Sequence, residues 1–86
     1  MTEWRAVTES GRIYESVGNG EGIRVSGDRY YHSPVVKSLP GAANIDWALA
    51  HSLPEVERPV IGERLLIYSF GGDWRVSTRI VEVEDV

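Results

Sequence analysis

Few residues of this chain have side chains that could do chemistry, and their spacing does not bring them together. The histidines are His32 and His51. Asp46, His51 and Ser52 are the residue types of a Ser–His–Asp site, whose members must converge in space. Asp46 and His51 would not face one another on a helix, so we interpret these side chains as surface or capping groups. The sequence predicts no catalytic residue.

Three carboxylates near the middle of the chain could be imagined as an acid–base pair: Glu55, Glu57 and Glu63. General acid–base catalysis needs one carboxyl group in an apolar pocket that raises its pKa. A linker flanked by prolines is a poor place for such a pocket, so we expect these carboxylates to be solvated. Cysteine is absent, which leaves only histidines and carboxylates as metal ligands, and we predict neither a metal site nor a cofactor.

The segment 18–22 has the Gly-x-Gly-x-Gly spacing of some phosphate-binding loops. Such loops follow a strand and open a helix, whose N-terminus binds the anion. Here a β-prone segment follows the loop, and Glu21 would repel phosphate. The sequence therefore predicts a plain β-turn.

Arginine and aromatic side chains are dense in the last third of the chain. The binding candidates there are Arg64, Tyr68, Phe70, Trp74, Arg75 and Arg79. Binders of single-stranded nucleic acid combine stacking aromatics with cations, and protein interfaces use the same residue types as hot spots. A third interpretation buries the aromatics in the core and leaves the arginines facing solvent. Whether Tyr68, Phe70 and Trp74 point inward or outward decides between these alternatives.

A further binding candidate is Tyr31, which follows another tyrosine in a β-prone segment. Successive strand residues point to opposite faces, so at least one of Tyr30 and Tyr31 should face solvent. An exposed tyrosine on an edge strand interrupted by Pro34 could recruit a partner by strand addition or support a homo-oligomer.

Short β-prone segments separated by turn residues predict the elements that position these side chains. Strands are expected over 4–9, 12–17, 23–26 and 29–36, and Pro34 marks an edge strand or a bulge in the last of them. Alternation places Trp4, Ala6 and Thr8 on one face of the first strand, and Tyr14 and Ser16 on one face of the second.

The middle of the chain breaks this pattern. Asn44 can cap a short helix near 44–52, which Pro54 would stop. The residues from 53 to 60 then read as a linker.

Two registers are open for the closing hairpin, which lies within 58–84. A two-residue turn places Ser69 opposite Trp74, whereas a three-residue turn places Phe70 opposite Trp74. We favour the second, because it gathers aromatic and aliphatic side chains on one face, where cross-strand pairs stabilise the sheet.

Two local features of the hairpin strands follow from the same pattern. The two-residue register also places Arg64 beside Arg79. The adjacent apolar residues Ile80 and Val81 indicate a bulge or burial on both faces.

Length and composition limit the class of protein. The chain has 86 residues and a net charge of −4, so it forms one domain, 1–86, and is a poor general binder of nucleic acid. It shows neither a signal peptide nor an apolar run long enough for a membrane helix. With no cysteine, these features favour a cytoplasmic protein and give no reason to expect membrane binding.

The two ends of the chain have recognisable patterns. The segment 7–15 fits T-x-S-G-x-x-Y, and the segments 59–65 and 76–84 fit G-x-x-L and [ST]-[ST]-x-[VI]-V-x-[VI]-E. This resembles a group of small β-rich proteins encoded by bacteriophages of actinobacteria and by actinobacterial genomes. Ser77-Thr78-Arg79 departs from the usual Thr-Ser-Pro order of that group. The group has no assigned activity, and the resemblance implies a small β-barrel, a host-cytoplasm setting and an accessory role.

We therefore predict a mostly β domain, a small SH3-like or related partly open antiparallel barrel of about five to six strands with one short helix near 44–52. We expect a non-enzymatic protein-interaction module, a phage accessory protein whose partner is a host bacterial protein. The alternatives are a barrel that binds single-stranded nucleic acid and a self-associating structural protein.

Overall fold

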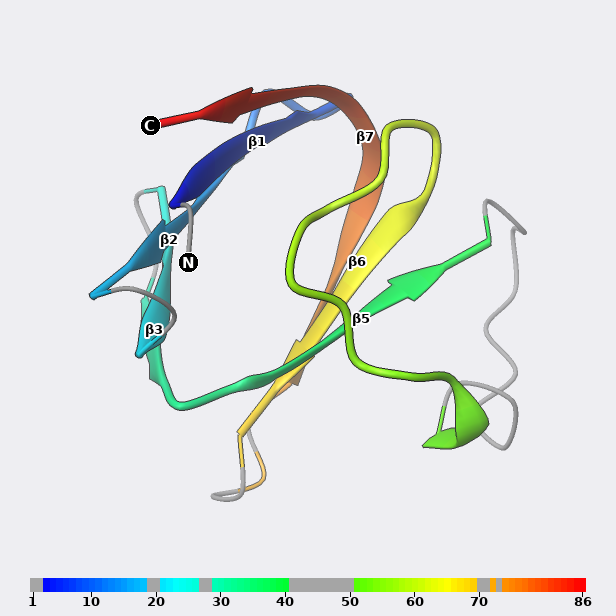
Figure 1. Ribbon diagram of the computed structural model, residues 1–86. Helices are drawn as coiled ribbons and strands as arrows, with labels where there is room; N and C mark the ends of the chain where they lie inside the picture. Colours follow the sequence, from blue (N-terminus) through cyan, green and yellow to red (C-terminus); the bar gives the residue numbers. More distant parts are fainter. Residues whose placement is uncertain (1–2, 19–20, 27–28, 41–50, 70–71, 73) are drawn as a thin grey trace.

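The computed structural model describes residues 3–18, 21–26, 29–40, 51–69, 72 and 74–86 (Figure 1). Seven strands lie in the described part of the chain: β1 (Trp4–Thr8), β2 (Ile13–Val17), β3 (Gly22–Val25), β4 (Tyr30–His32), β5 (Val35–Leu39), β6 (Arg64–Tyr68) and β7 (Trp74–Asp85). They form one antiparallel sheet in the order β4-β3-β2-β1-β7-β6-β5. The mostly β fold predicted from the sequence is confirmed.

The predicted helix near 44–52 falls largely on residues 41–50, which lie outside the described part of the chain. Its last two residues, His51 and Ser52, are described and have helical backbone conformation. No helix among the described residues has both the length and the apolar character that crossing a membrane requires.

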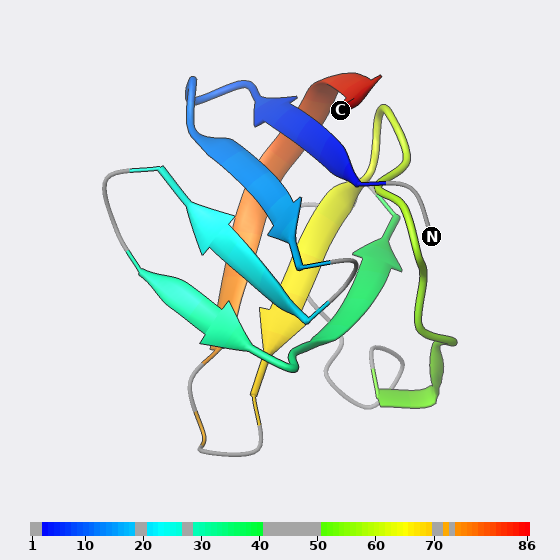
Figure 2. The ribbon, with the colours of Figure 1, turned by 60° about the vertical axis from the view of Figure 1, so that its left-hand side comes forward.

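The sheet curls into a partly open barrel because its two edge strands are consecutive in the chain. β4 and β5 stand at opposite ends of the strand order, yet Ser33 and Pro34 alone join them. Ser33 has a φ of 46°, and Pro34 has no N–H to donate to a ladder. No ladder joins β4 to β5 in the described residues, so a seam remains open between them (Figure 2).

This break at Pro34 explains the strand count. The predicted strand 29–36 forms two short edge strands, so the described residues hold seven strands instead of five to six. The expected edge position of Pro34 fits its place between the two edge strands.

Alternating side chains fill the inside of the barrel, as the sequence predicts for the first two strands. Trp4, Ala6, Thr8, Tyr14 and Ser16 are buried, and the strand residues between them are partly exposed. The inner core consists of Trp4, Ala6, Tyr14, Ile23, Val25, Tyr31, Val36, Leu65, Ile67 and Ile80, with Val56 and Val83 packed against it.

A second apolar cluster lies on the outer face of β5, β6 and β7. It contains Leu39 and Leu66, with Leu53, Tyr68 and Val76 packed against them. Strand β6 is therefore covered on both faces, which accounts for its three consecutive buried residues.

The hairpin between β6 and β7 has neither of the two registers considered from the sequence. Tyr68 lies opposite Trp74, Ile67 opposite Arg75, and Leu66 opposite Val76. The loop is thus longer than either turn, and the amide of Gly72, at a φ of 92°, donates to the carbonyl of Ser69 (3.1 Å) within it. An aromatic cross-strand pair does form, but Tyr68 rather than Phe70 faces Trp74. The preference for the three-residue turn was wrong.

Two β-bulges set the remaining register of β7. The first, opposite Leu65, places Arg64 opposite Arg79, a pair that belonged to the two-residue register and not to the favoured one. The second leaves Val81 without a partner, because Val7 pairs with Glu82 and the next residue, Thr8, pairs with Ile80. Ile80 is 1% exposed and Val81 is 51% exposed, which confirms the bulge predicted there.

Candidate functional site

The predicted binding residues of the last hairpin divide between its two faces. Residues directly opposite one another in antiparallel strands share a face, and so do alternate residues of one strand. The pairs Tyr68–Trp74 and Arg64–Arg79 therefore lie on the outer face, beside the outer cluster. We call this surface, formed by these four residues, the hairpin face.

Trp74 is the most exposed aromatic side chain of the hairpin face, at 59%. Tyr68, opposite it, is half-buried and held from two sides: its ring centroid is 5.9 Å from Lys37 Nζ and 6.3 Å from the His51 ring, which meets it edge-on. Lys37 Nζ also donates a hydrogen bond to the backbone oxygen of His51 (2.9 Å). Tyr68 thus packs between Lys37 and His51, beside an exposed tryptophan.

Arg75 does not lie on the hairpin face, although the sequence placed it among the binding candidates. It stands opposite Ile67, which is fully buried, so its side chain is directed into the barrel. Inside, burial raises the pKa of the Tyr14 phenol, and a hydrogen bond with Arg75 together with the positive charge of that residue partly offsets the rise. Arg75 thus belongs to the polar interior.

Tyr31 is also wrong as a surface candidate. It is 4% exposed, lies opposite Ile23 and belongs to the inner core. Tyr30 is the tyrosine that faces solvent, at 47%, and this confirms that one of the two is exposed. Its ring lies over Gly22 of the neighbouring strand, where a Cβ atom would collide with it. Phe70 lies outside the described residues.

The residues that could do chemistry stay apart. His32, on the edge strand β4, has its ring 6.5 Å from that of Tyr30, whereas His51 contacts Tyr68 on the other half of the sheet. The Glu63 carboxylate accepts a hydrogen bond from Ser38. Among the described residues, no group of three or more histidines and carboxylates could hold a metal ion.

The Gly-x-Gly-x-Gly segment joins β2 to β3, and its described residues Gly18 and Glu21 have turn conformation, as the sequence predicts. The amide of Glu21 donates to the carbonyl of Gly18 (3.3 Å), and β3 begins at Gly22. A strand follows the turn, so no helix N-terminus faces it.

A pocket of about 370 Å³ lies at the end of the barrel where β1 begins, and no pattern in the sequence indicates it. Its walls are Trp4, Ser16, Ile23, Pro34, Val36, Glu55, Val56 and Glu57. The segment 53–59, which we call the strap, closes one side. The strap passes round the edge of β5, because Leu53 packs in the outer cluster and Val56 against the inner core.

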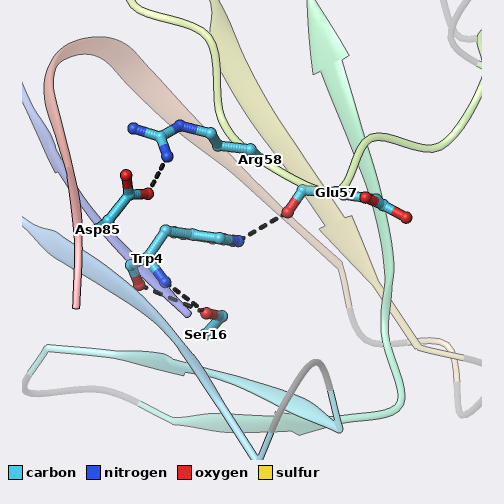
Figure 3. Close-up of polar contacts among 5 residues, drawn as sticks. All are labelled: Trp4, Ser16, Glu57, Arg58 and Asp85. Atoms are coloured by element: carbon cyan, nitrogen blue, oxygen red, sulfur yellow. Dashed lines mark hydrogen bonds and ion pairs between the residues drawn. The ribbon is translucent and has the colours of Figure 1, made fainter. Parts of the chain in front are cut away.

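Among the described residues, a backbone bridge, a side-chain hydrogen bond and an ion pair hold the strap. The amide of Val56 donates to the carbonyl of Val36 (2.9 Å), and Glu55 forms a β-bridge with Lys37. Trp4 Nε1 donates to the carbonyl oxygen of Glu57 (2.9 Å), and Arg58 forms an ion pair with Asp85 (Figure 3).

Ser16, on the neighbouring strand β2, positions the backbone of Trp4. The amide of Trp4 donates to Ser16 Oγ (2.8 Å), so the hydroxyl takes the place of a backbone acceptor at the end of the β1–β2 ladder. The indole can then reach across the opening to the strap. Glu55 and Glu57 are exposed, as expected for solvated carboxylates.

No family model, no curated protein and no solved structure matches this chain.

Proposed function

We propose that this protein is a non-enzymatic protein-interaction module that binds its partner through the hairpin face. The observation that supports this most is Trp74, which is 59% exposed beside the fixed ring of Tyr68. Tryptophan, tyrosine and arginine are the residue types most enriched in interface hot spots.

The Arg64–Arg79 pair extends the hairpin face toward the other end of the strands. Arg64 and Tyr68 are four positions apart along β6, a span of about 13 Å at the usual rise per strand residue. Arg64 Nε donates to the carbonyl of Ser77 (3.1 Å), which orients the first guanidinium, while Arg79 is exposed. A partner that places an apolar side chain at Trp74 and a carboxylate near Arg79 would match this surface.

The resemblance to actinobacteriophage proteins supports a more specific form of the proposal. The partner would be a host bacterial protein, the setting the host cytoplasm, and the domain a barrel of SH3-like type that modulates host physiology.

Affinity capture from an actinobacterial lysate tests the proposal. The immobilised protein should retain a partner, and Trp74→Ala should reduce its recovery by about tenfold or more, as expected for a hot spot. Tyr30→Ala is the matched control, since Tyr30 is 47% exposed on the edge strand β4, away from the hairpin face, and should leave recovery unchanged. Equal loss in both variants, or no partner at all, would contradict the proposal.

Binding of single-stranded nucleic acid is the second candidate, because bases stack on exposed aromatics beside arginine. Titration with an oligothymidylate at two salt concentrations tests it: binding should weaken steeply with salt and on Arg79→Ala. The net charge of −4 makes this candidate weaker than protein binding. Self-association through the same face is the third, and a mass that does not change with concentration would remove it.

A further inference from the structure

We propose that an extended peptide replaces the strap and pairs with β5 as an added strand. The peptide carries an acidic residue followed by a large aliphatic residue, at the positions that Glu55 and Val56 occupy in the strap. This site lies on the edge of β5, apart from the hairpin face, so it holds or fails independently of the proposed function.

Strand β5 is one edge of the sheet, and its outer side is where another strand would pair. The carbonyl of Val36 points to that side, because it accepts a hydrogen bond from the amide of Val56 (2.9 Å). In an antiparallel ladder the backbone groups of alternate residues point to the same side, so those of Ser38 do as well. The edge thus offers two residues for main-chain pairing.

The strap follows this edge as a strand would, but its pairing is incomplete. Glu55 forms an antiparallel bridge with Lys37, and this register places Pro54 opposite Ser38. A proline has no N–H, so the strap has no donor for the carbonyl of Ser38 at this position. A peptide with any other residue there has that donor and would form one more main-chain hydrogen bond with β5.

The pocket beneath the strap favours a large side chain at the inward position. Val56 packs against the inner core and lines the pocket, whose other walls include Ile23, Pro34 and Val36. A space of about 370 Å³ therefore adjoins the valine side chain. Leucine in the same place would reach further into this space, and the burial of one more methylene group would raise the affinity up to about fourfold.

The preference for an acidic residue comes from Lys37. Its side chain lies on the outer face, where Nζ is placed over the ring of Tyr68 and donates to the backbone oxygen of His51. Residues opposite one another in antiparallel strands share a face, and opposite charges at such positions stabilise the pairing. Glu55 holds the position opposite Lys37 in the strap, so an acidic residue of the peptide would take its place.

The exchange costs few contacts. The Arg58–Asp85 pair is exposed, and exposed ion pairs contribute little to stability (Figure 3). The hydrogen bond to the carbonyl of Val36 is formed again by the amide of the aliphatic peptide residue. The next peptide residue presents its own carbonyl to Trp4 Nε1, in place of the carbonyl of Glu57.

An NMR titration of the whole protein tests the proposal. The probe is acetyl-Leu-Thr-Glu-Leu-Glu-amide, which follows the strap from Leu53 to Glu57 with threonine for the proline and leucine for the valine. The Val36 and Ser38 amides should shift saturably, and hydrogen exchange at the amide of Val56 should become faster, because the peptide covers the edge and releases the strap. No saturable shift, or a Val56 amide that stays as protected as before, would overturn the proposal.

Three further peptides separate the contributions. The peptide with proline in place of threonine lacks the extra donor and should bind about two- to tenfold more weakly, the usual range for one hydrogen bond. Valine in place of the central leucine should weaken binding up to about fourfold. Aspartate at that position should abolish binding, because a carboxylate would enter the apolar pocket. Equal affinity of all the peptides would contradict pairing along β5.

A variant of the strap provides the second readout. Asp85→Asn removes the ion-pair partner of Arg58 and should tighten binding of the probe about two- to fivefold, since less of the binding free energy is used to displace the strap. Glu84→Gln is the matched control, because Glu84 forms an exposed ion pair with Arg5 away from the strap, and it should leave the affinity unchanged. Equal affinity in the wild type and Asp85→Asn would place the peptide outside the site beneath the strap and refute the proposal.

Discussion

Trp4 and Trp74 lie in opposite environments. Trp4 is 4% exposed and uses its indole N–H to tie β1 to the strap, whereas Trp74 is 59% exposed at the end of the hairpin. The first side chain stabilises the barrel, and the second is exposed on the hairpin face. Substitutions at the two positions should therefore separate stability from binding.

Trp4→Phe should lower the free energy of unfolding by about 1–3 kcal/mol, because it removes a hydrogen bond and part of a buried aromatic side chain. Trp74→Phe should change it by no more than about 0.5 kcal/mol, since the ring is largely in solvent. Urea denaturation measures both values. A similar loss in the two variants would mean that the bond to the strap contributes little.

The phenol of Tyr14 makes the stability sensitive to alkaline pH. Burial raises its pKa above the ordinary 10.0, and the hydrogen bond and charge of Arg75 lower it only part of the way back. The neutral phenol therefore favours the folded state below pH 10.0, and this stabilisation is lost as the pH rises through the folded-state pKa. When the pH is raised, the absorbance of tyrosinate should show a titration phase above the ordinary tyrosine pKa. Tyr14→Phe should remove this phase, and Tyr30→Phe should leave it in place.

At the scale of the elements, the bulges of β7 align the hairpin with the rest of the sheet. At the first bulge the amide of Leu65 donates to Ser77 Oγ (2.8 Å), which supplies the acceptor that the ladder lacks there. Without this bond a buried N–H would lose its partner. The bulge thus depends on one hydroxyl.

Ser77→Ala should destabilise the protein by about 1–3 kcal/mol, the usual cost of a buried donor left unsatisfied. Thr78→Ala is the matched control, because the Thr78 hydroxyl is exposed and only contacts Ser10. Thermal and urea denaturation of the two variants should differ clearly. If both are as stable as the wild type, the amide of Leu65 finds another acceptor.

The sequence could predict those elements whose pattern is local. The alternation of Trp4, Ala6 and Thr8 and the bulge at Ile80 and Val81 depend on neighbouring residues, and both are confirmed. The choice of Tyr31 rather than Tyr30 as the exposed tyrosine was wrong. Alternation along a strand shows that neighbouring side chains point to opposite faces, but it does not show which of them points inward.

The pocket could not be predicted for a related reason. It exists because Trp4 and Glu57, which are 53 residues apart in the chain, meet through an indole hydrogen bond. Nothing in the sequence near either residue indicates this contact. The hairpin register was missed because only two- and three-residue turns were considered. In the observed register, Leu66 and Tyr68 pack in the outer cluster.

For the molecule as a whole, the strap and the central strands should differ in local stability. Strand β6 lies between two ladders and is covered on both faces, whereas the strap is held by a few contacts at the barrel edge. Segments with few contacts open without unfolding the rest of the protein.

Native-state hydrogen exchange should therefore find the amide of Val56 at least about tenfold less protected than the amides of β6. Asp85→Asn, which removes the partner of Arg58, should increase exchange at Val56 and leave β6 unchanged. Identical opening free energies for the strap and β6 would show that they unfold as one unit.

The strap also has a bearing on solubility at high protein concentration. The outer edge of β5 presents backbone groups that could pair with the edge of another molecule, and Val35 and Val36 would make such pairing apolar. The Lys37–Glu55 bridge and the hydrogen bond from Val56 to Val36 occupy part of this edge. At the other end of the sheet, β4 is only three residues long and has polar His32 exposed, so it is a poor template for pairing. Loosening the strap would thus uncover the one long edge of the sheet, and the expected result is intermolecular strand pairing and aggregation.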